Sequence, residues 1–187
     1  APDLIIVYDG YNDIKSYYGE NIDPENSQFS EKESSAINWK ANWIELCKLG
    51  EAHNFKMIVT LQPLLGTGNK LLTDNEFAMM KSYSSTILAE GYVNFADQLD
   101  EINQNCTAAY DLRYVYDMYL GSIYSDYAHV GNSGNEIVAK IFYEIINDSI
   151  KNNDDDKNNI NKFSSSAYNV QELLMDKIRA EKIELSN

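Results

Sequence analysis

The chain has 187 residues, of which 44% are hydrophobic and 24% charged, and its formal net charge is −14. This length and composition are ordinary for one globular domain that folds on its own core. The negative charge argues against nucleic acid as a partner, and no apolar run approaches the ~20 residues that a membrane span needs.

The first residues combine an apolar run with a polar turn. Residues 4–7 read Leu-Ile-Ile-Val, which is typical of a parallel strand covered on both faces. The polar segment Asp-Gly-Tyr-Asn-Asp follows directly at residues 9–13. Ligands of open α/β sheets bind beyond the carboxyl ends of the strands, so Asn12 lies where its amide can donate to a substrate. We expect a polar loop over residues 14–33 to form part of the substrate rim.

The later elements alternate between helix and strand. Helical spacing of apolar residues predicts a helix over residues 34–53, capped by Ser34 or Ser35. Residues 56–62 are predicted to form the second strand, and residues 63–72 a loop. Further along the chain we expect a helix (74–89), a short strand (92–96), an irregular tyrosine-rich segment (99–125) and a helix (133–150) with Ser133 at its N-cap. This order predicts an α/β fold with a parallel sheet.

Composition changes sharply after this predicted domain, which covers residues 1–150. Residues 151–168 are rich in Asn, Asp and Lys and are expected to be a polar linker. Residues 169–187 are expected to form a C-terminal helical tail, amphipathic over residues 170–183. A simple appended tail is favoured over an element that binds another chain.

The two cysteines are too few for a disulfide scaffold. Cys47 falls on the apolar face of a predicted helix and is expected to be a small core residue. Cys106 falls in a polar segment. A disulfide between them is the less favoured alternative, and a thiol nucleophile is not expected because neither has a neighbouring histidine.

Asp126 and His129 are three residues apart, just before a predicted helix. A Ser-His-Asp triad needs a histidine base and a carboxylate that holds the other ring N–H. A turn at this spacing can fold the carboxylate back onto the imidazole. The alternative, an ordinary turn aspartate with a surface or core histidine, would be favoured if this motif stood alone.

A metal site is the competing use of the acidic residues Asp9, Asp13 and Asp126 together with His129. Their spacing matches no recognisable set of metal ligands. The sequence therefore predicts neither a metal nor an organic cofactor.

The Gly-x-Asn-Asp segment after a strand and the later Asp-x-x-His segment together resemble the later sequence blocks of SGNH hydrolases, the GDSL-type esterases and lipases. The resemblance spans the predicted domain and implies a three-layer α/β/α sandwich of flavodoxin-like topology. It implies ester hydrolysis through an acyl-enzyme, with Asn12 as an oxyanion donor, His129 as general base and acid, and Asp126 orienting it. Gly10 would permit close backbone approach or a positive φ, and Asp13 would brace the loop.

The family's first block, Gly-Asp-Ser, which supplies the nucleophile, does not occur in this sequence. We therefore expect an N-terminally incomplete domain, inactive alone, whose nucleophilic serine lies outside the chain; the first residues, Ala1-Pro2, lack a Met. An acyltransferase of the same fold and a degenerate binding module are the alternatives. The expected partner is a small-molecule or carbohydrate ester. The sequence leaves the particular ester, the compartment (secreted or cytoplasmic) and the oligomeric state open.

Overall fold

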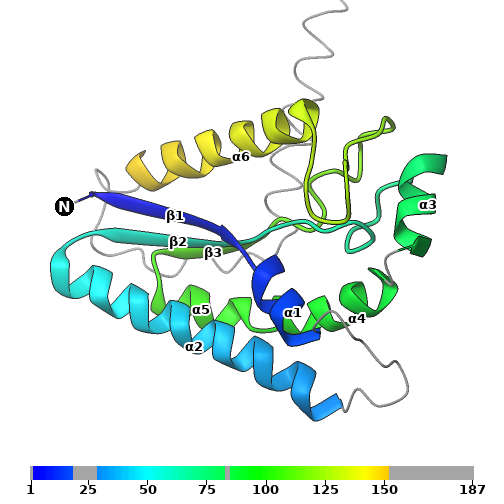
Figure 1. Cartoon of the computed structure of the whole chain (residues 1–187). Helices are drawn as coiled ribbons and strands as arrows, with labels where there is room; N and C mark the ends of the chain where they lie inside the picture. Colours follow the sequence, from blue (N-terminus) through cyan, green and yellow to red (C-terminus); the bar gives the residue numbers. More distant parts are fainter. Residues whose placement is uncertain (1, 19–28, 83–84, 152–187) are drawn as a thin grey trace, which may run out of the picture.

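The computed structural model describes residues 2–18, 29–82 and 85–151 (Figure 1). These residues form an α/β structure, as predicted. Its elements in chain order are β1 (Leu4–Asp9), α1 (Tyr11–Tyr18), α2 (Phe29–His53), β2 (Lys56–Leu61), α3 (Asp74–Ser82), α4 (Ser85–Ala96), α5 (Leu99–Asn105), β3 (Ala108–Asp111) and α6 (Asn132–Lys151).

The three strands form one parallel sheet in the order β1-β2-β3. Leu61 at the end of β2 is paired with Asp9 of β1 and with Asp111 of β3. All three strands therefore end at the same edge of the sheet. The segments that follow them converge there, which is where α/β proteins place their ligands.

Helices pack against the sheet through alternating residues of the central strand. Ile58 of β2 lies in a buried cluster with Ile141 and Ile145 of α6. Its neighbour Val59 lies in a second cluster with Trp39 of α2. Because successive strand residues point to opposite faces, α6 and α2 cover different faces of the sheet, as Figure 1 also shows. Full burial of each such side chain contributes roughly 1.5–3 kcal/mol.

The prediction of a loop over residues 14–33 is wrong for the described part of that range, which is helical. Helix α1 begins at Tyr11, and its buried Tyr11 and Ile14 lie one helical turn apart on its inner face. Helix α2 begins at Phe29, so Ser34 and Ser35 lie inside it and do not cap it. Residues 19–28 lie outside the described residues.

The strand predicted over residues 92–96 is also wrong, because these residues belong to α4. The third strand is instead β3, within the segment expected to be irregular, and α5 precedes it. The predicted helix over residues 74–89 is α3 followed by α4, and residues 83–84 lie outside the described residues.

The last predicted helix is confirmed as α6, which begins at Asn132, so Ser133 lies within its first turn and is not the N-cap. The predicted linker and tail lie outside the described residues apart from Lys151. No helix in the described part of the chain is both long and apolar enough to cross a membrane.

Cys47 and Cys106 form a disulfide, which corrects the expectation of free cysteines. The bond joins α2 to the residue that follows α5. Cys47 lies on the inner face of α2, as predicted, but its sulfur contacts a partner 59 residues away in the sequence. The two cysteines meet because the fold brings α5 alongside α2.

Candidate active site

Asp126 and His129 lie in a short hairpin between β3 and α6. Tyr124 and Val130 form an antiparallel bridge at its base. The Ser125 N–H donates to the His129 carbonyl at 2.9 Å, and the Gly131 N–H donates to the Ile123 carbonyl at 2.8 Å. These bonds close the loop, so the two candidate catalytic residues are held within one turn.

The Asp126 carboxylate folds back onto His129, as the spacing predicts. Its Oδ2 lies 2.7 Å from Nδ1 of the His129 ring. Its Oδ1 accepts the backbone N–H groups of Ala128 at 2.8 Å and His129 at 2.7 Å. Partial burial of Asp126 opposes its ionisation, but these hydrogen bonds outweigh burial and hold its pKa below the ordinary value. The carboxylate is thus a fixed, ionised acceptor for one ring nitrogen.

The His129 side chain is 75% exposed. Because Nδ1 faces the Asp126 carboxylate, that nitrogen carries the proton in the neutral ring. Nε2 is then the nitrogen with a free lone pair. A hydroxyl group that approaches from solvent can reach it.

Gly10 joins β1 to α1 with a positive φ of 120°, the conformation expected at this position. A Cβ at Gly10 would lie 2.4 Å from the Tyr92 hydroxyl and 2.7 Å from Leu61 Cδ1. Only glycine therefore allows the chain to turn here. The turn places Asn12 in the first turn of α1, exposed to solvent.

Asp13 lies beside Asp9 beneath this turn. Burial and the neighbouring Asp9 carboxylate raise the pKa of Asp13. Asp9 is in turn held by the Trp39 indole, whose Nε1 donates to Oδ2 at 3.1 Å. The Ser35 hydroxyl donates to the Asp13 carbonyl at 3.5 Å. The bracing role expected for Asp13 stays a prediction.

Two tyrosines connect the start of α1 to the hairpin, and neither was among the site residues predicted from the sequence. The hydroxyls of Tyr11 and Tyr127 are hydrogen-bonded to each other, and their rings meet edge to face at 5.2 Å. The Tyr11 ring centroid also lies 6.4 Å from that of His129. Because Tyr11 directly precedes Asn12, these contacts place Asn12 and His129 on neighbouring segments. The only sequence signal was position, since each tyrosine adjoins a predicted site residue.

A cavity of about 220 Å³ lies between the loop after β2 and the loop after β3. Tyr124, at the base of the hairpin, lines this cavity. Leu65 lies between the lining residues Leu64 and Gly66, and its N–H donates to the Tyr127 carbonyl of the hairpin at 2.9 Å. The cavity thus adjoins the candidate site. Its walls are formed by Leu64, Gly66, Gly68, Lys70, Leu72, Met80, Arg113, Tyr116 and Tyr124.

Among the residues that the structure describes, no group of three or more His, Cys, Asp or Glu side chains is placed to hold a metal ion. The competing set of Asp9, Asp13, Asp126 and His129 is therefore not assembled into a metal centre. Instead, Asp126 pairs with His129, and Asp13 lies beside Asp9. No family model, curated protein or solved structure matches the chain.

Proposed function

We propose that these residues are part of an SGNH-type ester hydrolase with an α/β/α sandwich fold. The observation that carries the proposal is the hydrogen-bonded pair of Asp126 and His129, presented on a closed hairpin at the carboxyl edge of a parallel sheet. A carboxylate, a histidine with one free nitrogen and a nearby amide are the groups that acyl transfer needs in addition to a nucleophile.

Each group has a distinct role in the proposed reaction. His129 Nε2 takes the proton of a serine hydroxyl as the serine oxygen attacks the ester carbonyl. The Asn12 amide donates to the oxygen that becomes negative in the tetrahedral intermediate. His129 then returns the proton to the departing alcohol, and water repeats the sequence on the acyl-enzyme. Asp126 holds the ring in the required tautomer and stabilises the imidazolium.

The proposal requires a serine hydroxyl from a segment outside these residues, because no Gly-Asp-Ser occurs in the sequence. Strand β1 offers a place for that segment. It pairs with β2 along one side and forms an edge of the described sheet. Its residues are less buried than those of β2. A parallel strand added along this edge would end beside Gly10 and Asn12, within the same site.

The exposed His129 side chain can be reached by water or by an alcohol, and either can be the second acceptor. Acyl transfer to an alcohol needs the same catalytic residues but exclusion of water. The adjoining cavity is lined by Leu, Met and Tyr side chains together with Lys70 and Arg113, and its apolar part suits the acyl or alkyl part of a small ester.

Turnover of p-nitrophenyl acetate tests the proposed function. The chain alone should show no turnover above its own His129→Ala variant. Joined to the serine-bearing segment it should turn over the ester, with the activity lost in His129→Ala and strongly reduced in Asp126→Asn, because an amide can hold the wrong tautomer. Turnover by the chain alone would place the nucleophile within it. Full activity in His129→Ala would refute the proposed site.

A further inference from the structure

Glu76 lies in the first turn of α3, and its side chain is 0% exposed. Its Oε2 accepts the Lys70 ammonium at 2.8 Å, the Thr73 N–H at 3.0 Å and the Thr73 hydroxyl at 3.1 Å. Its Oε1 accepts the backbone N–H groups of Ile123 at 2.8 Å and Tyr124 at 3.2 Å. One buried carboxylate therefore joins the start of α3 to Ile123 and Tyr124, which lie 47 and 48 residues further along the chain.

Only part of this arrangement is needed to begin a helix. Thr73 and Glu76 form a capping box, in which the glutamate reaches back to the N–H of the capping residue. That role uses Oε2 alone. The contacts of Oε1 with Ile123 and Tyr124 do nothing for α3, so they indicate a second role.

Ile123 and Tyr124 are the residues that lead into the hairpin carrying Asp126 and His129. The Ile123 carbonyl and the Tyr124 bridge close the base of that hairpin, and Glu76 holds the N–H groups of the same two residues. We infer that Glu76 is a positioning residue, which fixes the hairpin so that Asp126 meets the His129 ring. This inference deepens the proposed function, on which the catalytic meaning of the hairpin rests.

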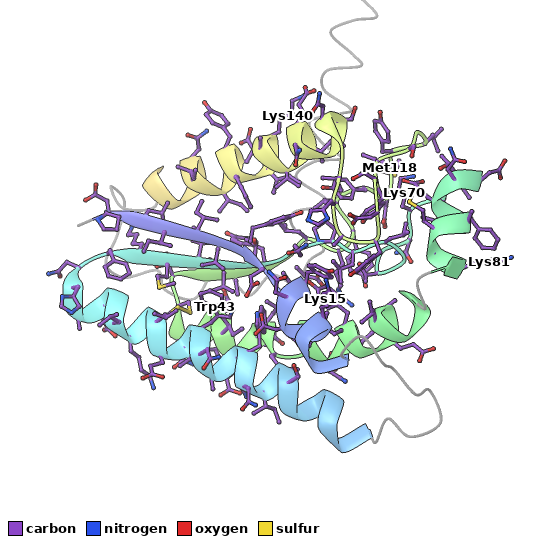
Figure 2. The ribbon with its side chains drawn as sticks, viewed as in Figure 1. Lys15, Trp43, Lys70, Lys81, Met118 and Lys140 are labelled. Atoms are coloured by element: carbon purple, nitrogen blue, oxygen red, sulfur yellow. A yellow bond between two sulfur atoms is a disulfide. The ribbon has the colours of Figure 1, made fainter. Side chains whose placement is uncertain are left out.

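Lys70 completes the arrangement from the loop between β2 and α3 (Figure 2). Its side chain is 4% exposed, and its ammonium also donates to the Leu71 carbonyl at 3.2 Å. A buried carboxylate needs a charge partner to stay ionised, and only the ionised form accepts hydrogen bonds through both oxygens without donating one. Lys70 therefore supports the contacts of Glu76 with the hairpin without touching the hairpin N–H groups.

Glu76→Gln separates the two roles of the side chain. An amide has one oxygen, and the Lys70 ammonium is the strongest donor around it, so the oxygen turns toward Lys70 and Thr73. Its NH₂ group then faces the N–H groups of Ile123 and Tyr124, which lose their acceptor. Thr73→Ala is the matched control, because it removes the capping hydroxyl but leaves Oε1 with Ile123 and Tyr124. Both variants weaken the start of α3, and only the first releases the hairpin.

Two NMR measurements on the chain show whether the hairpin is ordered, and neither requires enzymatic activity. Long-range ¹H–¹⁵N spectra at about pH 8.5, where free histidine is neutral, show whether the His129 ring keeps its proton on Nδ1. His53→Gln assigns the signals, since the chain has two histidines. Amide exchange at Ala128 and His129 reports the turn that Asp126 closes.

We expect Glu76→Gln to shift the His129 nitrogens toward a mixture of tautomers and to speed both amides by about tenfold or more. Thr73→Ala should leave both readouts close to wild type. Wild-type spectra in Glu76→Gln, or equal changes in the two variants, would overturn the inference.

If Glu76→Gln does not fold, the same two measurements on Glu76→Asp test the inference. The aspartate keeps the charge but is one methylene shorter. Lys70 and Thr73 should still hold its carboxylate, which should therefore lose its contacts with the hairpin. Wild-type readouts in this variant would overturn the inference. These outcomes are distinct from failure of the proposed function, because absence of ester turnover would leave the effect of Glu76 on the hairpin unchanged.

Discussion

Asn12 and His129 lie on neighbouring segments but act differently in the proposed mechanism. The Asn12 amide helps only after the carbonyl oxygen has become negative. In a protein that carries the proposed serine-bearing segment, Asn12→Ala should therefore lower kcat by about 10²–10³ and leave KM nearly unchanged. Steady-state kinetics measure both constants, with Asn42→Ala on the exposed side of α2 as a control. A change in KM alone would assign Asn12 to substrate binding instead.

Gly10 determines whether the Asn12 segment can take its place at all. Gly10→Ala must adopt an unfavourable positive φ and place its Cβ 2.4 Å from the Tyr92 hydroxyl. We expect it to lower the free energy of unfolding by about 1–3 kcal/mol. Chemical denaturation measures this value. Gly131→Ala is the control, since its Cβ would meet nothing within 3.8 Å, and equal losses in the two variants would contradict the assignment.

At the scale of elements, the disulfide between Cys47 and Cys106 ties α2 to the end of α5. The bond closes a loop with a sequence separation of 59, and constraint of the unfolded chain over such a loop is worth about 2–4 kcal/mol. The double variant Cys47→Ser, Cys106→Ser should be less stable by that amount in denaturant unfolding. Reduction of the wild type should give a similar loss. Equal stability of oxidised and reduced protein would show that the bond contributes nothing.

The short elements were predicted less well than the long ones, and the reason lies in their residues. Residues 92–96, all apolar or aromatic except Asn94, form a run that is too short to separate a strand from a buried helix. In α4, Tyr92 and Phe95 share the buried face while Val93 is 47% exposed, which is a helical pattern decided by packing. Strand β3 has only four residues, two of them alanine, and gives little strand signal by itself.

In the candidate site, contacts between residues close in sequence could be predicted, whereas contacts between distant residues could not. The contact of Asp126 with His129 spans three residues, so the turn could be predicted from spacing alone. Glu76 reaches residues 47 and 48 positions away, and its sequence context predicts only a helix cap. The pairing of Tyr11 with Tyr127 spans 116 residues and likewise depends on the folded sheet.

For the whole molecule, Glu76 makes stability depend on pH in acid. Burial opposes its ionisation, but the N–H groups of Ile123, Thr73 and Tyr124 together with Lys70 lower its pKa from 4.5 to about 2. A carboxyl whose pKa falls on folding stabilises the protein above its unfolded pKa. That stabilisation, about 3 kcal/mol, is lost as the pH falls from about 4.5 to about 2.

The pH dependence of unfolding in Glu76→Gln tests this account. Because Gln does not titrate, the stability gap between wild type and Glu76→Gln should be widest above about pH 4.5. The gap should narrow by about 3 kcal/mol as the pH falls toward 2. Urea unfolding at a series of pH values gives both curves. Parallel curves for the two proteins would contradict the assigned shift.

The central claim is that His129 and Asp126 activate a serine that lies outside this chain. Labelling with a fluorophosphonate, which modifies only an activated serine, followed by peptide mapping tests it most directly. In a protein that joins this chain to the proposed serine-bearing segment, we predict one labelled serine outside the present sequence, and no labelling in His129→Ala. A labelled serine within the present sequence, or labelling that persists in His129→Ala, would contradict the account.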